Sequence, residues 1–213
     1  MLNNLRKYLL YFLILVYVSG AIGLLIQPSF FIPFTPYTLS LTCIVFLIYQ
    51  PLSKLNFVLG FLCIAIIGFA SEVIGVKTGF VFGDYHYGST LGYKLLGVPL
   101  VISLNWALLV TCGIILTKSL TSNKALNALC SAGLITVIDL LIEQLAPSLD
   151  FWHFKTGFAG IHNYLGWFII SFITSFLLQN YVGSGNKKTA YIILVLQVFF
   201  FGFMYLIKLF NFV

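Results

Sequence analysis

Seven apolar stretches, each close to the length of a helix that crosses a lipid bilayer, take up most of this 213-residue chain. The apolar core of a bilayer is roughly 30 Å thick and needs about 20 apolar residues per helix. The stretches cover residues 5–26, 35–50, 55–76, 98–118, 124–145, 164–181 and 189–210. We therefore predict an all-α polytopic bundle of about seven transmembrane helices, forming a single integral membrane domain over residues 1–213.

The second stretch is the shortest of the seven. Prolines at positions 33, 36 and 51 set its ends, because proline is tolerated at a helix start but not in a helix interior. A re-entrant second segment would reduce the count to six. The first stretch is too long for the core of a signal peptide and lacks a small-residue cleavage site, so we expect it to stay in the mature protein.

Charged residues make up only 8% of the chain, against about 25% in a typical soluble domain. This deficit argues against an ordinary cytosolic globule, a disordered chain and a nucleic-acid-binding protein. With a cytoplasmic N-terminus, the inner side holds Arg6, Lys7, Lys54, Lys118, Lys124, Lys187 and Lys188, and the outer side holds Lys77, Lys94, Lys155 and Lys208. The excess of basic residues inside predicts this orientation in the cell (inner) membrane.

The four cysteines, Cys43, Cys63, Cys112 and Cys130, each lie inside an apolar stretch, and no two form a C-x-x-C pair. We interpret them as small, buried apolar residues. This pattern predicts neither a disulfide framework nor a zinc site.

The few acidic residues gather towards the outer half of the predicted bundle. Asp139 and Glu143 are four residues apart on one predicted helix, so they share a face. Glu72 lies one turn before the outer end of the third helix. Carboxylates at membrane depth usually face a cavity or a partner, and two adjacent ones cannot easily both ionise. The pattern predicts a proton-handling site, with purely structural acids as the alternative.

Residues 78–99 are too polar and too rich in glycine to span the membrane. Glycine permits tight turns and close approach of the backbone, and irregular backbone at membrane depth survives only against protein or a cavity. We predict a lid or re-entrant loop in which Gly83 and Gly88 flank a turn that brings Tyr85 and Tyr87 to a cavity mouth. The alternative is an interfacial loop with an aromatic belt. We interpret His86 as an interface residue, not as a metal ligand.

Within and after this segment, the chain resembles the carotenoid biosynthesis membrane proteins typified by the carotenoid 1,2-hydratases. The resemblance rests on the sequences SEVIGVKTGFVFGDYHYG (71–88), LGYKLLGVPLVISLNW (91–106) and DLLIEQLAP (139–147), and on the W-x-F and NYLGWF patterns (152–154 and 163–168). It implies the addition of water to a terminal double bond of an acyclic carotenoid, without a metal or an organic cofactor. The expected partners are a lipophilic carotenoid, water and the lipid bilayer, together with other membrane enzymes of carotenoid synthesis.

Hydration of an unactivated alkene begins with proton delivery from a neutral carboxylic acid, which a membrane cavity favours. We assign Asp139 as this acid, Glu72 as the group that activates water with help from Asn105, and Glu143 as a neighbour that tunes the proton. Aromatic faces could stabilise the intermediate cation. The predicted substrate-binding residues are Tyr85, Tyr87, Trp106, Trp152, Asn163 and Trp167.

Three other functions fit parts of the pattern. A heptahelical carotenoid or lycopene cyclase would use the same acids but lose a proton in place of capturing water. A non-enzymatic carotenoid-binding protein would use the aromatic residues to hold the pigment. A small transporter would require discontinuous helices and repeat symmetry, and the sequence indicates neither clearly.

Overall fold

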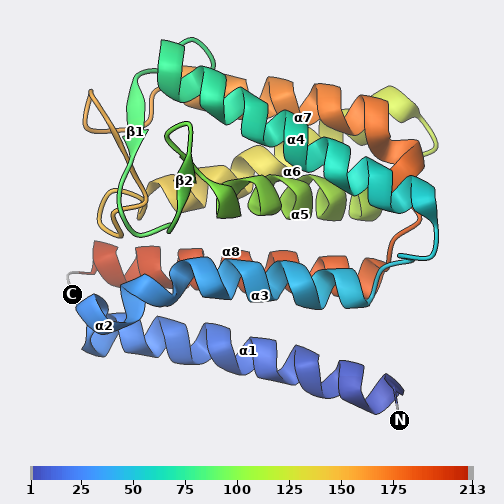
Figure 1. Cartoon of the computed structure of the whole chain (residues 1–213), viewed down its shortest axis with the longest axis horizontal. Helices are drawn as coiled ribbons and strands as arrows, with labels where there is room; N and C mark the ends of the chain where they lie inside the picture. Colours follow the sequence, from blue (N-terminus) through green and yellow to red (C-terminus); the bar gives the residue numbers. More distant parts are fainter. Residues whose placement is uncertain (1, 211–213) are drawn as a thin grey trace.

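The computed structural model describes residues 2–210 and consists mainly of helices (Figure 1). The helices are α1 (Leu2–Ile26), α2 (Pro28–Phe31), the short 3-10 helix η1 (Ile32–Phe34), α3 (Thr35–Ile48), α4 (Leu55–Thr78), α5 (Leu100–Thr117), α6 (Lys124–Glu143), α7 (Ile161–Val182) and α8 (Lys187–Leu209). The strands within the described residues are β1 (Tyr85–Tyr87), β2 (Lys94–Leu95), β3 (Val98–Pro99) and β4 (Trp152–Phe154). Seven helical segments are long and apolar enough to cross a membrane. The prediction of an all-α polytopic bundle is therefore confirmed.

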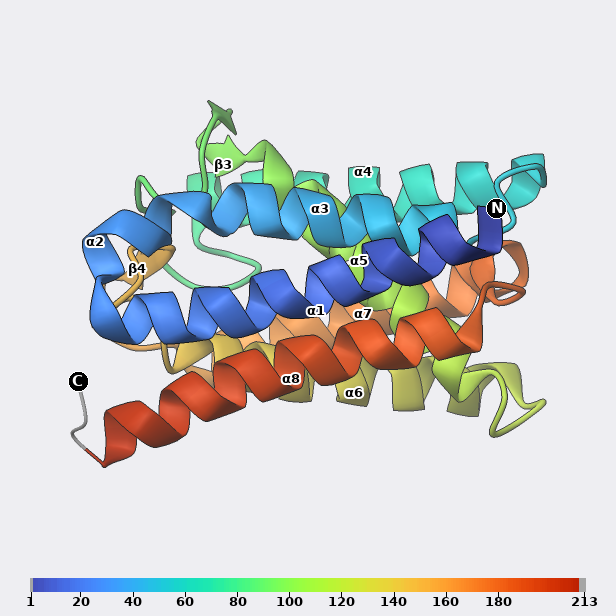
Figure 2. The same cartoon turned by 90° about the horizontal axis from the view of Figure 1, so that it is seen from below.

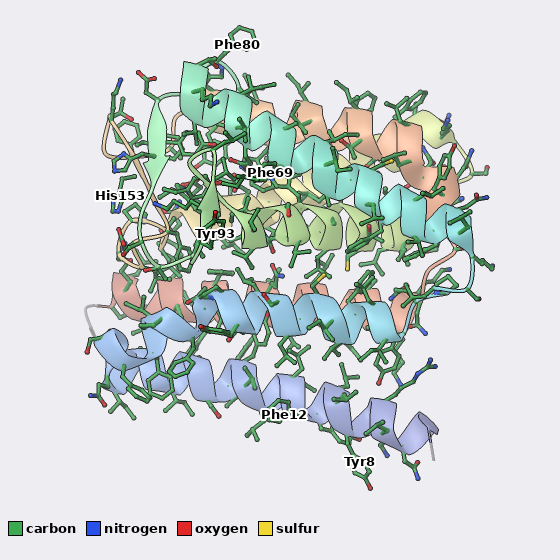
Figure 3. The ribbon with its side chains drawn as sticks, viewed as in Figure 1. Tyr8, Phe12, Phe69, Phe80, Tyr93 and His153 are labelled. Carbon is green, nitrogen blue, oxygen red and sulfur yellow. The ribbon has the colours of Figure 1, made fainter. Side chains whose placement is uncertain are left out.

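The spans form two groups that lie side by side (Figures 1 and 2). Helices α4, α5, α6 and α7 form one group, and α1, α3 and α8 cover one side of it. Helix α5 packs against α3, α4, α6, α7 and α8, and it is the most buried span. Helix α1 lies at the edge, where Tyr8 and Phe12 are exposed and point away from the bundle (Figure 3). Such side chains are stable in a bilayer, because lipid tails are as apolar as leucine.

The second span contains the kink that its prolines require. Pro28 begins α2, Pro33 lies in η1 and Pro36 lies in the first turn of α3. These three pieces form one segment, Pro28–Ile48, that is long and apolar enough to cross a membrane. The second segment is therefore longer than predicted, which favours seven spans over the alternative of six.

Two asparagines fix the starts of the helices that follow short loops. The Asn123 side chain accepts hydrogen bonds from the amides of Ala125 at 3.0 Å and Leu126 at 3.1 Å, at the start of α6. Asn186 accepts one from the amide of Thr189 at 3.0 Å, at the start of α8. Each cap satisfies backbone donors that have no partner within the helix.

The prediction that all four cysteines are buried was wrong for two of them. Cys43 and Cys112 are buried, but Cys63 and Cys130 are exposed on the bundle surface. The error has a physical reason, because an apolar stretch in a membrane protein supplies both the core and the lipid-facing surface. Position within such a stretch does not decide between the two.

The two ends of the bundle differ in character. The N-terminus and the α3–α4, α5–α6 and α7–α8 connections lie at one end, and the C-terminus lies at the other with the strands (Figure 1). We call the latter the lid end. The basic residues predicted as cytoplasmic lie at the N-terminal end. We propose that this end faces the cytoplasm, since positive residues concentrate there.

Cysteine labelling tests this orientation. In a chain whose native cysteines are replaced, a cysteine at position 187 is expected to react only with reagent from the cytoplasmic side. A cysteine at position 155 is expected to react only from the opposite side. Labelling of both positions from the same side would refute the topology.

Residues 79–99 form a folded lid over one end of the bundle (Figure 1). Helix α4 ends at Gly79, whose φ of +66° is the left-handed conformation that glycine adopts readily. Strand β1 then pairs antiparallel with β4, with Tyr85 opposite Phe154 and Tyr87 opposite Trp152. Strands β2 and β3 form a hairpin. The predicted turn between Gly83 and Gly88 was wrong, because these glycines flank strand β1.

Candidate active site

Strands β1 and β4 direct aromatic rings into the bundle, because successive side chains on a strand point to opposite faces. The inward side chains are buried and comprise Tyr85, Tyr87, Trp152 and Phe154. The outward side chains are His86 and His153, whose rings stack with centroids 5.5 Å apart. His86 therefore lies outside the cavity described below.

Glu72, on α4, is buried and accepts hydrogen bonds from three side chains. The hydroxyls of Tyr85 and Tyr87 donate to Oε2, the second at 2.8 Å. The indole nitrogen of Trp106 on α5 donates to Oε1 at 2.9 Å. Burial and the adjacent Glu72 raise the pKa of both tyrosines, so their hydroxyls remain donors at neutral pH.

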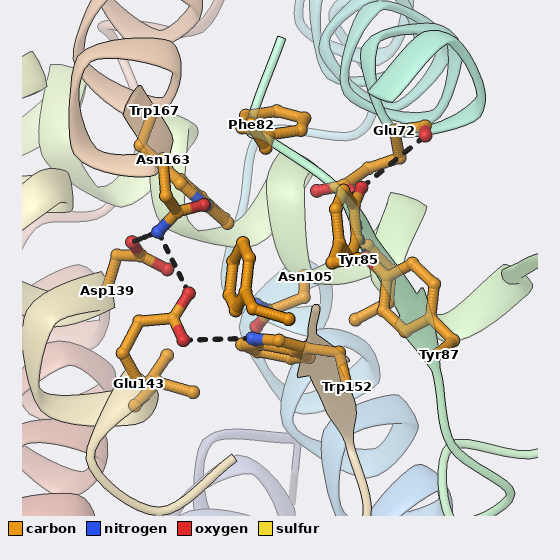
Figure 4. A pocket seen from close by; sticks show the side chains of 13 residues that line it. Glu72, Phe82, Tyr85, Tyr87, Asn105, Asp139, Glu143, Trp152, Asn163 and Trp167 are labelled. Carbon is orange, nitrogen blue, oxygen red and sulfur yellow. Dashed lines mark hydrogen bonds between the residues drawn. The ribbon is translucent and has the colours of Figure 1, made fainter. Parts of the chain in front are cut away.

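Asp139 and Glu143 are bridged by one amide (Figure 4). The Asn163 Nδ2 atom, on α7, donates to Asp139 Oδ2 at 3.1 Å and to Glu143 Oε1 at 2.9 Å. The indole of Trp152 donates to Glu143 Oε2 at 3.0 Å. Helix α6 thus supplies both acids, and α7 and β4 supply the donors that orient them.

Two oxygen atoms at this site lack a protein partner. Asp139 Oδ1 and Asn105 Oδ1 are buried and accept no hydrogen bond from the described residues. Glu72, Asp139 and Glu143 have six carboxylate oxygens. Each of the five besides Asp139 Oδ1 accepts at least one hydrogen bond. A buried polar atom without a partner usually binds water or marks a functional position.

These groups surround one small cavity at the lid end. Its lining consists of Glu72, Phe82, Tyr85, Tyr87, Ile102, Asn105, Asp139, Ile142, Glu143, Trp152, Phe154, Asn163 and Trp167. The cavity has a volume of about 20 Å³. A single water needs about 10–15 Å³, and benzene enters an engineered cavity of about 150 Å³. The closed site therefore has room for water, but not for a branched hydrocarbon end group.

Comparison with known proteins identifies the family. Residues 34–213 match the family described as carotenoid biosynthesis protein. The chain belongs to this family. It is also 29% identical over 119 residues to the bisanhydrobacterioruberin hydratase of Haloarcula japonica. That match covers 52% of this chain and 41% of the relative, so the chain spans less than half of the relative's length. No solved structure matches the chain.

In this member of the carotenoid biosynthesis family, every predicted site residue lines the cavity except Trp106. Trp106 donates a hydrogen bond to Glu72. Its ring stacks on that of Trp167, with centroids 4.0 Å apart. It can orient Glu72 through its indole N–H, but it does not line the cavity as a substrate-binding residue would. The distinction could not be made from sequence, because it depends on which face of α5 meets α7.

Four lining residues were missed by the sequence analysis, namely Phe82, Ile102, Ile142 and Phe154. Phe82 has the clearest explanation, because it packs where Gly75 and Gly166 have no side chain. Phe82 also contacts Trp106 and Trp167, at centroid distances of 6.3 and 6.2 Å. Glycine on two neighbouring helices is the only sequence signal that could have indicated this position.

A polar latch joins the lid to the segment that carries Trp152. The Asp150 carboxylate accepts hydrogen bonds at 2.7 Å from both the amide and the hydroxyl of Ser89. His153 Nε2 lies 2.7 Å from the other carboxylate oxygen. Hydrogen bonds from His153 and Ser89 lower the pKa of Asp150 to about 2. Since the folded pKa is depressed, the latch's contribution to stability is present above about pH 4 and is lost as the pH falls towards 2.

Gly88 permits this latch, because a Cβ atom there would overlap the Asp150 backbone carbonyl and carboxylate. Gly88→Ala is therefore expected to separate the lid from β4. Overpacking of this kind should make amide hydrogen exchange in residues 85–87 about tenfold faster. Gly202→Ala in α8 is the matched control, because its Cβ would meet no atom within 4 Å. Equal exchange in the two variants would show that Asp150 does not hold the lid.

Proposed function

We propose that this chain catalyses the cofactor-independent addition of water to a terminal double bond of an acyclic carotenoid. Family membership supports a carotenoid-modifying enzyme, and the relative from Haloarcula japonica bears the name of a hydratase. The observation that carries the proposal is the free Oδ1 atom of Asp139, beside two other carboxyl groups in a cavity that can hold water.

Proton transfer from Asp139 begins the proposed reaction. The protonated Oδ1 gives its proton to the less substituted carbon of the double bond, forming a C–H bond and a tertiary carbocation. Asp139 is left as a carboxylate. Its free oxygen suits this step, because a general acid must reach the substrate with the atom that carries the proton.

Aromatic faces stabilise the carbocation in this scheme. Tyr85, Tyr87, Trp152 and Trp167 line the cavity. A cation over an aromatic face gains roughly 0.5–2 kcal/mol, with the larger values in desolvated sites. The rings also restrict access of bulk water, so that only a positioned water reaches the cation.

Glu72 and Asn105 direct the water in the second half of the reaction. Asn105 Oδ1 has no partner among residues 2–210 and is available to accept a hydrogen bond from water. The water oxygen bonds to the carbocation, and its proton passes to Glu72 Oε1, which accepts a single hydrogen bond, from Trp106. Three surrounding donors hold Glu72 in position. Return of the proton from Glu72 to Asp139 restores the starting state, so each cycle consumes one alkene and one water.

Glu143 holds the geometry of the proton donor in this proposal. Asn163 Nδ2 donates to Asp139 and Glu143 at once, and Trp152 occupies the remaining Glu143 oxygen. As a proton donor, Glu143 is less available to the substrate than Asp139, whose Oδ1 accepts no hydrogen bond from the described residues. It therefore tunes Asp139 through Asn163.

Expression of the chain in a host that accumulates an acyclic carotenoid tests the function. Mass analysis of the extracted pigments is expected to show products heavier than the substrate by one water per modified end. A host carrying an empty vector is the control. An isomer of unchanged mass would indicate the cyclase alternative, and bound but unaltered pigment would indicate a binding protein. Either result would refute hydration.

A further inference from the structure

A second, larger pocket lies beside the candidate active site. It is lined by α1, by the α2–α3 segment, by α8, and by Leu149 and Phe151. Its volume is about 490 Å³, which falls in the range of roughly 300–1,000 Å³ typical of ligand pockets. We call it the apolar groove. Its walls include Tyr17, Leu24, Phe31, Leu41, Phe151 and Phe200.

The groove contains little that would bind a polar ligand. None of its described lining residues carries a charge. The hydroxyl of Tyr17 is already within 3.2 Å of the Thr42 hydroxyl. An occupant therefore gains mainly from the burial of apolar surface, which is worth roughly 25 cal/mol per Å².

Two consecutive residues connect the groove with the acid cavity. Phe151 lines the groove, and Trp152 lines the cavity. Their rings contact each other, with centroids 5.9 Å apart. Phe151 lies at the bend before β4, and the two rings together form a wall with Phe151 on the groove and Trp152 on the cavity. Trp152 also binds Glu143, so movement of the wall is coupled to the acids.

We propose that the apolar groove holds the polyene chain of the carotenoid, with the end group passing the Phe151–Trp152 wall into the acid cavity. This inference rests on the proposed function. The cavity has room only for water, so a substrate end must displace part of its lining. The long apolar remainder of the substrate must lie outside the cavity. The groove adjoins that lining, is apolar, and is about 490 Å³ against about 20 Å³ for the cavity.

Filling the groove tests the proposal. Gly20 on α1 lines the groove, and its nearest neighbour to an added Cβ would be Phe200 at 3.9 Å. Gly20→Phe therefore places a ring in the groove without an immediate backbone clash. Thr38→Phe fills the groove from α3 and serves if the first variant does not fold. Gly202→Phe is the matched control, because Gly202 faces open space outside the groove.

Binding is measured separately from catalysis. Each change is made in the Asp139→Asn chain, and the purified proteins are titrated with lycopene in lipid nanodiscs. Overpacking should weaken lycopene binding about tenfold in Gly20→Phe and Thr38→Phe, while Gly202→Phe should bind like its parent. Three results would overturn the groove assignment. They are unchanged binding in both filled variants, no binding by the Asp139→Asn parent, and a lipid acyl chain in the groove that lycopene does not displace.

The two proposals can fail independently. If lycopene binds in the groove but the unmodified chain, which carries Asp139, never hydrates it, the groove assignment stands and hydration is refuted. If Gly20→Phe and Thr38→Phe chains that carry Asp139 hydrate the substrate at an undiminished rate, the proposed function stands and the groove assignment is refuted.

Discussion

Replacement of Asp139 by asparagine is expected to leave the carotenoid end group unconverted. Asparagine is nearly the same size as aspartate and can still accept a hydrogen bond from Asn163, but it has no acidic proton to give. General acid catalysis typically contributes about 10²- to 10⁴-fold to a rate. Conversion should fall by at least that factor, measured as hydrated pigment formed per unit of membrane-inserted protein.

Asp84→Asn is the matched control for this change. It makes the same substitution of carboxylate by amide at an exposed lid position, where Asp84 pairs with Lys155 at 3.0 Å. Exposed ion pairs contribute about 0–1 kcal/mol, so conversion should stay close to that of the unmodified chain. A fully active Asp139→Asn chain would remove Asp139 from the proton-transfer step.

The architecture of this chain could be predicted because each membrane span is marked by its own stretch of neighbouring residues. Each membrane span requires about 20 apolar residues, and the chain presents seven such stretches. Prolines mark the start of the second span, although Pro28 begins it earlier than the apolar pattern alone indicates. The predicted start of α7 was three residues late for the opposite reason, because polar residues such as Asn163 belong to the helix but interrupt the apolar pattern.

The grouping of the acids could also be predicted, but their hydrogen bonds could not. Helical spacing places Asp139 and Glu143 on one face, and depth in the membrane brings Glu72 to a similar level. The pairing of β1 with β4 joins segments more than sixty residues apart, and no local pattern indicates its register. That register decides that Trp152 contacts Glu143 and that Tyr85 and Tyr87 contact Glu72.

The apolar groove could not be predicted from the sequence either. Its walls come from α1, α3, α8 and the segment before β4. Every one of these residues fits an ordinary lipid-facing or core position in the sequence. A pocket of this kind depends on how far apart packed helices lie, and apolar periodicity does not record that separation.

Replacement of Glu72 by glutamine is expected to stop the reaction after proton transfer. The glutamine oxygen can still accept from Trp106 and the tyrosine hydroxyls can rotate, so the lid should stay in place. The water that attacks the carbocation would then have no base to receive its proton. The carbocation would then lose a hydrogen from an adjacent carbon to Asp139, either the one just delivered or one of the substrate's own, and an alkene would be recovered. Hydrated product should fall by about 10²- to 10⁴-fold, the usual contribution of a general base.

Deuterium exchange distinguishes this loss from the loss in Asp139→Asn. In heavy water, Glu72→Gln should return part of the substrate with deuterium on the carbon that Asp139 protonates, because reversible protonation survives and the carbocation can lose its original hydrogen in place of the deuteron. Asp139→Asn should leave the substrate unlabelled. Tyr87→Phe separates a loosened lid from loss of the base, because it removes one of the three donors to Glu72 but keeps the carboxylate and the aromatic ring, so it should still form hydrated product. If Glu72→Gln forms hydrated product at the rate of the unmodified chain, Glu72 is not the group that receives the proton.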